Sequence, residues 1–516
     1  MSDKIQQNDP LQFPELVIGL IGAIGTDSEK ILETLKAALL QVNYDLVPIH
    51  LIDSVRQIEK WSQIATEPLD FDIRYAAHMD AGNEFRKLLN RGDAFALLGA
   101  AGIARERTNT TGDRRTPRAR TAYALRSLKR PEEVWALRNT YGRNFFALAA
   151  YSSKPKRLAR LANKISVSRS TPVSPGIQRA AEELIERDEA ELQNKLGQNI
   201  RAAFPISDFF VDADSPKLAD QVKRIVELIF GYLFHTPIRE EYGMFHAWAA
   251  SLRSASLGRQ VGAAICTDAG DLLATGCNEV PKAHGGLYWP NDEPDARDHH
   301  RGEDSNDVIK QEILADLLNR LKLGSWLNKE KSRLSPKQML DQVLADPSPD
   351  GLKKATLMGI TEYGRMVHAE MAALMQAARL GTPVEGAVLF STTFPCHNCT
   401  KHIVAAGIKR LTFIEPYPKS RASELHGDSI DVEQDPEDPS RVSFRSFVGV
   451  SPRQYFSLFS VGDSPRKEGS KVKKWIPENA APRLAESPFA YLPREEEELT
   501  TFDNLLEKSN LTPVTK

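Results

Sequence analysis

The sequence predicts an α/β fold in two successive domains, each built on its own sheet. An apolar strand, a glycine-rich turn and a helix occupy residues 16–40, and further strand–helix alternation follows, as is typical of a parallel sheet. Residues 240–414 run hairpin, helix, strand, helix, strand, which predicts a layered α/β/α domain. The expected division is a domain at 14–235, a second at 236–461 carrying an insertion at 282–361, and a polar tail at 462–516.

Composition places the chain among water-soluble globular proteins of more than one domain. It has 516 residues, 41% hydrophobic and 26% charged, and a net charge of -2, so no global basic field argues for nucleic acid. We expect no membrane span and no signal peptide, since apolar runs are short and residues 1–10 are polar. Only four cysteines occur, which indicates a reducing, cytoplasmic setting.

The first strand enters a turn that is similar to phosphate-binding loops. Backbone amides and the N-terminus of the following helix attract phosphate oxygens. Such loops end in Gly-Lys-Ser/Thr, whereas here Thr26 follows Gly25 and no lysine is present. We interpret the loop as binding a nucleotide without efficient hydrolysis, and the alternative is a tight turn with no ligand. The candidate nucleotide-binding residues are Gly19, Gly22, Ala23, Ile24, Gly25, Thr26 and Asp27.

Further strands are expected near residues 44–51, 122–126 and 144–151, with a helix from Gly82 to about Arg107 broken near Gly92 and Gly99. Residues 105–120 read as a mobile basic loop that either meets phosphates or RNA or is simply exposed. Five basic residues near element ends either close over phosphates or form a solvated surface: Arg126, Lys129, Arg130, Arg138 and Arg143.

A pair of short motifs organises the second domain. His368-Ala-Glu370 and Pro395-Cys396-His-Asn-Cys399 match the known signature of zinc deaminases. Catalytic zinc takes three protein ligands and keeps a position for water, and His368, Cys396 and Cys399 supply the three. The metal makes that water a hydroxide near neutral pH. Glu370 lies close enough to carry its proton to the substrate and then to the leaving amine.

Other interpretations of these cysteines and histidines stay open. Cys-x-x-Cys also occurs in redox pairs, and a structural zinc site could recruit His397 or His402. Cys266 and Cys277 fall in apolar, strand-like segments and are expected to be buried thiols. The insertion carries a candidate second metal cluster, for which a solvated acidic loop is the alternative: Asp292, Asp295, Asp298, His299 and His300.

Four motifs together resemble the deoxycytidylate deaminase family. Besides the two zinc motifs, they are Gln-Val-Gly-Ala at 260–263 and Gly-Cys-Asn-Glu-Val-Pro at 276–281. By this resemblance, Asn278 contacts the sugar and phosphate side of the substrate, and Arg259 is a further candidate for substrate binding. With the glycine-rich domain in front, the chain over about 16–460, including 415–420, resembles bacterial anti-phage dCTP deaminases, in which a P-loop kinase-like domain is fused to a deaminase domain.

That resemblance implies zinc-dependent deamination of free dCTP and dCMP during phage infection, with restraint by a small antitoxin RNA. It also implies ATP or GTP at the N-terminal domain and a symmetric homo-oligomer. Two rival functions remain. One is a deaminase of single-stranded DNA or tRNA, which shares the same motif; the other is a nucleotide-sensing regulatory protein whose zinc is structural.

Overall fold

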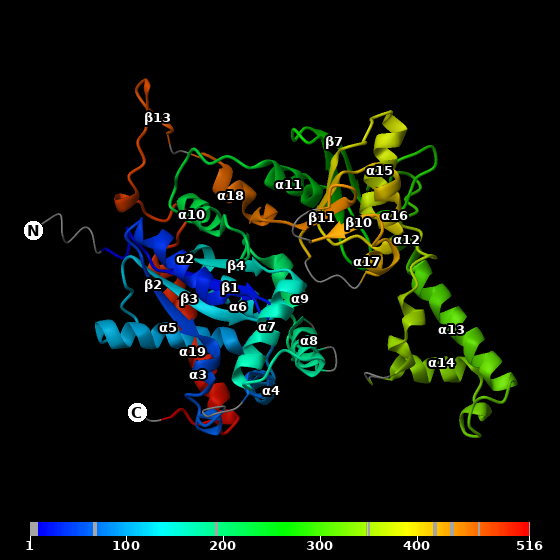
Figure 1. The fold of residues 1–516 in the computed structure, drawn as a ribbon, viewed down its shortest axis with the longest axis horizontal. Helices are drawn as coiled ribbons and strands as arrows, with labels where there is room; N and C mark the ends of the chain where they lie inside the picture. The colour runs from blue at the N-terminus through cyan, green and yellow to red at the C-terminus, as the bar shows by residue number, and fades with distance from the viewer. Residues whose placement is uncertain are drawn as a thin grey trace, which may run out of the picture. The chain divides into compact units, whose positions relative to one another are not determined.

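The computed structural model describes residues 9–64, 70–189, 191, 194–346, 348, 351–415, 420–433, 438–462 and 465–514. The chain forms two compact units (Figure 1). The first comprises Met1–Glu241, Ile414–Pro418 and Ser446–Lys516, and the second comprises Tyr242–Phe413 and Lys419–Arg445. Both are α/β, which confirms the predicted fold class, and no described helix is long and apolar enough to cross a membrane.

The first unit contains a six-stranded sheet in the order β12-β5-β4-β1-β3-β2. Neighbouring strands among β5, β4, β1, β3 and β2 are parallel, and β12 pairs antiparallel at the edge. The strand bounds are β1 Leu16–Gly22, β2 Asp45–His50, β3 Thr121–Leu128, β4 Phe145–Tyr151, β5 Phe209–Asp212 and β12 Gly449–Val450. The four-residue β5 and the two-residue β12 were not predicted.

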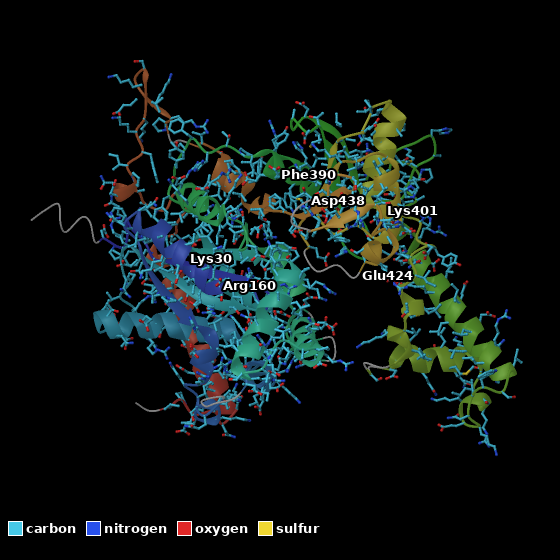
Figure 2. The ribbon with its side chains drawn as sticks, viewed as in Figure 1. Lys30, Arg160, Phe390, Lys401, Glu424 and Asp438 are labelled. Carbon is cyan, nitrogen blue, oxygen red and sulfur yellow. The ribbon has the colours of Figure 1, made fainter. Side chains whose placement is uncertain are left out.

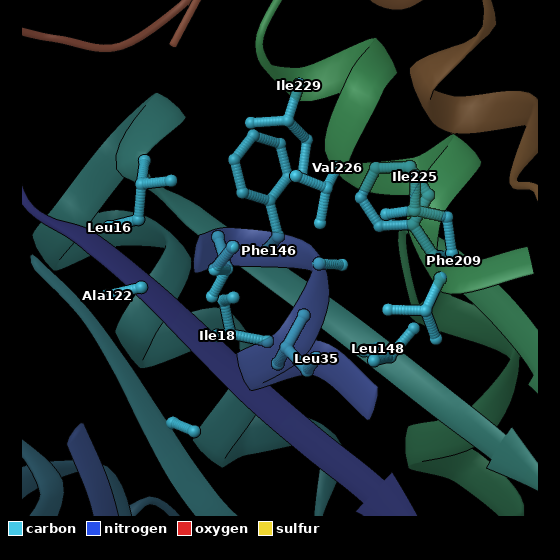
Figure 3. Packing of buried hydrophobic residues seen from close by; sticks show 14 of the residues in the cluster. Leu16, Ile18, Leu35, Ala122, Phe146, Leu148, Phe209, Ile225, Val226 and Ile229 are labelled. Atoms are coloured by element: carbon cyan, nitrogen blue, oxygen red, sulfur yellow. The ribbon is translucent and has the colours of Figure 1, made fainter. Parts of the chain in front are cut away.

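Helices cover both faces of this sheet, as an all-parallel core requires. Side chains of α2 and α10 pack on one face, where Leu35, Ile225 and Ile229 meet Ile18 and Phe146 (Figure 3). On the other face α5 approaches Leu125 so closely that a Cβ on Gly99 would lie 2.9 Å from it. The helix bounds are α2 Ser28–Leu40, α3 Leu51–Val55, α4 Phe71–Leu89, α5 Ala94–Thr111, α6 Pro131–Tyr141, α7 Lys154–Ser168, α8 Pro175–Glu189, α9 Ile200–Ala203, α10 Leu218–Ile229 and α18 Tyr455–Phe459. The helix after α10, α11 Arg239–Ser251, lies mostly in the second unit.

The glycine-rich turn lies at the carboxyl edge of the sheet. β1 is flanked by β3 and β4, so the chain leaves β1 in one direction and later returns to its other side. Ligands of open α/β sheets bind beyond the carboxyl ends of the strands at such a reversal. Residues 22–28 therefore occupy the position in the fold where a ligand is expected.

Two expectations for residues 82–120 are wrong. The helix breaks near Gly92, as predicted, but it runs unbroken through Gly99, because that glycine permits close packing on the sheet. The expected basic loop is helical as far as Thr111. Arg107 within it is fully buried, and its guanidinium pairs with Glu15 (2.8 Å) and with Glu495.

The segment predicted as a polar tail contains a long helix. Residues 488–508 form α19 (Pro488–Lys508), which packs beside α5 and α6 of the first unit (Figure 1). Its buried residues Tyr491, Leu499 and Phe502 recur at helical spacing, and Glu495 is buried against Arg107. Before it, a short hairpin pairs β13 Lys467–Glu468 with β14 Lys471–Val472.

The second unit has a six-stranded sheet in the order β10-β11-β9-β8-β6-β7. The predicted hairpin is present as antiparallel β6 and β7, and β8 runs parallel to β9. Within the insertion, α13 and α14 pack together around Leu314, Leu318 and Met339. The bounds are β6 Gly262–Cys266, β7 Leu272–Cys277, β8 Val388–Ser391, β9 Arg410–Phe413, β10 Ile430–Val432, β11 Val442–Ser446, α12 Asp298–Arg301, α13 Ser305–Leu323, α14 Pro336–Ala345, α15 Ala369–Leu380, α16 His397–Ala405 and α17 Ala422–Leu425.

Candidate functional site

Two helix N-termini bring the deaminase motifs together. His368 is the N-cap residue of α15, and Cys396 is the N-cap residue of α16, where its Sγ accepts the amide N–H of Cys399 at 3.4 Å. His368 Nδ1 lies 3.3 Å from Cys396 Sγ and 3.4 Å from Cys399 Sγ. Figure 2 labels Phe390 of β8 and Lys401 of α16, the helix that Cys396 caps.

The geometry of these three side chains fits zinc. Metal–sulfur distances of about 2.3 Å and metal–nitrogen distances of about 2.0 Å place tetrahedral ligands about 3.5 Å apart. The two measured nitrogen–sulfur distances are close to that value, and all three ligand atoms lie within 4.8 Å of one another. Among the described residues no fourth histidine, cysteine or carboxylate joins the group, so neither His397 nor His402 completes a closed structural site.

The local environment also tunes the thiols and the carboxylate. Hydrogen bonding by the Cys399 thiol, by His368 and by the Cys399 amide lowers the pKa of Cys396. By contrast, Cys266 and Cys277 are buried, as predicted, and burial raises the pKa of each thiol to about 11. Zinc binds thiolate, so the helix N-terminus of α16 favours the form that the metal needs.

Glu370 lies in the first turn of α15 and is almost fully buried, at 3% exposure. Burial raises the pKa of its carboxyl. The Ser391 hydroxyl donates a hydrogen bond to Glu370 Oε1 at 3.0 Å, and Ser391 is itself fully buried in β8. The sequence did not single out Ser391, because a serine ending a strand carries no motif of its own.

A cavity of about 270 Å³ opens in front of these groups. The two candidate substrate residues, Arg259 and Asn278, line it together with His368, Glu370 and Cys396. The Asn278 side chain forms two hydrogen bonds with the backbone before β6: its Oδ1 accepts the Val261 N–H (2.7 Å) and its Nδ2 donates to the Arg259 carbonyl (2.8 Å). Its amide therefore holds the segment that carries Arg259 along the cavity wall.

Residues of the insertion complete the cavity wall. Asp298, Asp304, Asn306 and Thr361 all line it. Three of them are held in place: the Asp298 carboxylate pairs with Arg365 (2.7 Å), Asp304 caps α13, and the Asn306 amide donates to the Ile360 carbonyl (2.9 Å). The insertion is thus part of the site, which its length alone did not reveal.

The second candidate metal cluster is only partly assembled. Asp295, His299 and His300 lie within reach of one ion, whereas Asp298 pairs with Arg365 and Asp292 pairs with Lys282. The Asp295 carboxylate is already engaged by Arg297. The two histidines are exposed, which matches the alternative of a solvated loop.

In the first unit, five of the seven candidate nucleotide residues line a small cavity at the glycine-rich turn: Gly22, Ala23, Ile24, Gly25 and Thr26. Gly19 and Asp27 do not. Gly19 lies in β1, where a Cβ would lie 2.5 Å from Leu128 Cδ1, so close strand packing requires this glycine. Asp27 is the N-cap residue of α2 and accepts the Lys30 N–H at 3.2 Å.

The five basic residues divide in the same way. Arg126 and Lys129 line the loop cavity, and Lys129 Nζ donates to the Gly22 carbonyl at 3.0 Å. Arg130 pairs with Glu132 and Arg138 pairs with Asp208, and neither lines the cavity, nor does Arg143. Lys129, which follows β3, therefore places a cation beside the loop, whose own sequence has no lysine.

Comparison with known proteins identifies the second unit. Residues 238–415 match the family model described as "Cytidine and deoxycytidylate deaminase zinc-binding region", so this part of the chain is a cytidine/deoxycytidylate deaminase domain. The deoxycytidylate deaminase of Enterobacteria phage T2 is 44% identical over 55 residues, and ComE operon protein 2 of Bacillus subtilis is 43% identical over 53 residues. These matches span 11% and 10% of this chain and only 29% and 28% of the relatives.

A solved structure, the apo dCMP deaminase of cyanophage S-TIM5, aligns with 41% of this chain and 99% of its own at 16% identity and a TM-score of 0.22. The Glu415–Ser420 segment that contributed to the sequence resemblance lies largely outside the described residues, at 416–419.

Proposed function

We propose that the protein catalyses the hydrolytic deamination of deoxycytidine nucleotides, converting dCMP and dCTP to the uracil nucleotides with release of ammonia. One observation carries the proposal: His368, Cys396 and Cys399 form one cluster, and the cavity lined by His368 and Cys396 is also lined by the buried Glu370. A structural zinc site has no need of such a carboxylate, which argues against the regulatory alternative.

The residues divide the work as follows. A zinc ion held by the histidine and the two cysteines would supply an activated water to the cavity. Glu370 would accept one proton from that water and deliver it to the ring nitrogen, and would then carry the second proton, from the hydroxyl formed at C4, to the amino group that leaves as ammonia. Burial keeps the proton on Glu370 more readily than on an exposed carboxylate, and Ser391 fixes the carboxylate orientation.

The cavity wall supports a free nucleotide as substrate. Asn278 orders the segment of Arg259, a cation suited to a phosphate at the cavity wall. The matched family includes deaminases of both nucleosides and nucleotides, and two relatives are named deoxycytidylate deaminases of phages T2 and T4. A polynucleotide substrate is the rival, and the net charge of -2 does not favour it.

The resemblance of the whole chain extends this proposal. It adds dCTP to dCMP as a substrate, and it gives the role as depletion of deoxycytidine nucleotides during phage infection. It also adds restraint by a small RNA and assembly into a homo-oligomer. For the first unit, it adds binding of ATP or GTP at the glycine-rich loop. The parallel sheet with the loop at the reversal point supports nucleotide binding by the first unit.

A substrate panel tests the proposal. Purified zinc-containing protein is incubated with dCMP, dCTP, CTP, single-stranded DNA and tRNA, and uracil products and ammonia are quantified. We expect conversion of dCMP or dCTP, abolished by Glu370→Gln with zinc content unchanged, and retained by Glu385→Gln, a change of an exposed glutamate outside the cavity. Conversion of polynucleotides alone would replace the proposal with its rival, and full activity of the Glu370 variant would reject the mechanism.

A further inference from the structure

A buried carboxylate contacts the backbone of the glycine-rich loop. Asp188, in the last turn of α8, has no exposed surface. Its Oδ2 accepts the amide N–H of Ile24 at 2.7 Å, and its Oδ1 forms an ion pair with Lys129 Nζ at 2.8 Å. The Asp188 carboxylate thus contacts both a backbone amide of the loop and Lys129, the lysine that follows β3.

The backbone of the loop also leaves room for the anion of a bound ligand. Gly25 has a φ of 86°, and a Cβ there would lie 2.9 Å from the Arg157 carbonyl, so the backbone must stay bare at this turn. Thr26 Oγ1 is buried and has no hydrogen-bond partner within the described residues. An unsatisfied buried hydroxyl next to a loop amide indicates room for an oxygen acceptor that a bound ligand would bring.

A phosphate and the Asp188 carboxylate cannot share this position. Two anions about 4 Å apart repel strongly away from water, and each needs the same Ile24 amide and the same lysine. We propose that Asp188 is a built-in competitor for the anion site of the loop, and that a phosphate-bearing ligand binds only when the end of α8 moves away. The inference deepens the nucleotide binding proposed above for the first unit, on which it rests.

The contacts of α8 show what displacement would involve. Its apolar side, including Ile185, packs against α7 and the Ile24 side chain. At its C-terminal end, Glu189 pairs with Arg157 at 2.9 Å, and Arg157 lies against Gly25. Movement of the last turn would free the loop amide, while the packed first turns keep the helix attached.

A second cavity, of about 180 Å³, adjoins the loop and indicates the class of ligand. The two cavities share Tyr75, Arg126, Ser127 and Lys129. Phe95 also lines the larger cavity, which therefore offers aromatic and apolar surface beside the three cations Arg86, Arg126 and Lys129. A phosphate ester carrying a planar ring, as in a nucleotide, matches that combination.

The first test measures anion affinity. Binding of inorganic tripolyphosphate, a probe without a base for the deaminase cavity, is followed by calorimetry in the full-length chain. We expect Asp188→Asn to lower the Kd at least tenfold, because the amide side chain keeps the shape but removes the competing charge. The control Glu182→Gln changes an exposed carboxylate on the same helix and should leave the Kd unaltered.

The second test uses the unaltered protein and therefore does not depend on the folding of a variant. Hydrogen–deuterium exchange is compared with and without tripolyphosphate. Displacement predicts slower exchange at residues 24–26 and faster exchange at 185–189. Protection of both segments, an unchanged α8, no binding at all, or equal affinity in a folded Asp188→Asn variant would each overturn the inference. Deamination of dCMP is measured separately, so failure here is distinct from failure of the proposed reaction.

Discussion

The deaminase cluster and the glycine-rich loop are both built at helix N-termini, but they differ in how their polar groups are satisfied. At the deaminase cluster, His368, Cys396 and Glu370 face an open cavity. At the loop, the Ile24 amide and Lys129 already contact Asp188. Figure 2 labels Lys30 and Arg160 at the loop; Arg160 donates to the Gly25 carbonyl at 3.3 Å.

This difference shows that a sequence motif specifies which groups come together, but not whether they are free to bind a ligand. Motif spacing places the chemical groups, whereas their availability depends on residues distant in sequence. The partner of the loop lies 164 positions away, on α8. At the deaminase motif, Glu370 accepts a hydrogen bond from Ser391, 21 positions away, and still lines the open cavity.

The largest effect should come from removing a metal ligand. Cys399→Ser takes away one of three ligands, so zinc content should fall and deamination should drop by more than about a hundredfold, beyond the loss typical of outer-shell changes. Metal analysis and the nucleotide assay measure both. Cys277→Ser, the same change at a buried thiol outside the cluster, should retain zinc. Full zinc content in Cys399→Ser would mean that the cluster is not the metal site.

A large loss of stability should follow at the loop instead. Lys129→Met leaves the fully buried Asp188 carboxylate without its cation, which costs about 3 kcal/mol and lowers the Tm by roughly 5 °C or more. Lys36→Met, an exposed lysine on α2, serves as the control. Thermal unfolding followed by circular dichroism provides the measurement. An unchanged Tm would show that the Asp188–Lys129 pair contributes little to stability. The loop would then differ less from the deaminase cluster than the ion pair implies.

A smaller effect is expected where Ser391 positions the deaminase carboxylate. Ser391→Ala removes a hydrogen bond to a charged group, worth about 1.5–3 kcal/mol, so kcat should fall about tenfold or more while KM and zinc content stay nearly constant. Ser391→Thr keeps the hydroxyl and should recover much of the rate. Equal rates for the alanine and threonine variants would remove Ser391 from the positioning role.

The smallest effect concerns the cavity wall. Asn278→Ala removes two hydrogen bonds that hold the Arg259–Val261 segment, each worth about 1 kcal/mol. KM for the nucleotide should rise about fivefold with little change in kcat, and amide exchange of 259–261 should accelerate. Asp268→Ala, in the β6–β7 turn, is the control. A fall in kcat with unchanged KM would mean that Asn278 contacts the reacting atoms and does not merely order the cavity wall.

Local patterns predicted the elements around the zinc motifs well. α15 begins at Ala369 and α16 at His397, close to Val367 and Cys396, where the local patterns predict the two helices to start. The alanine-rich run after His368 and the proline before Cys396 are strong local determinants. Asp188 and Ser391 were not predictable as partners, since pairing across the fold leaves no trace in local spacing. α19 was obscured by the run Glu495–Glu498, in which Glu495 is buried by the guanidinium of Arg107.

The return of the chain to the first unit sets the order in which the protein can be completed during synthesis. β12 and α19, which supply the sheet edge and the carboxylate for Arg107, lie after residue 446. The segments of the deaminase unit emerge from the ribosome before them. Until these later segments are made, the first unit lacks its edge strand β12 and one of the two carboxylates that pair with Arg107. Truncation near residue 487 would remove α19 and the Glu495 carboxylate even though the deaminase unit is whole.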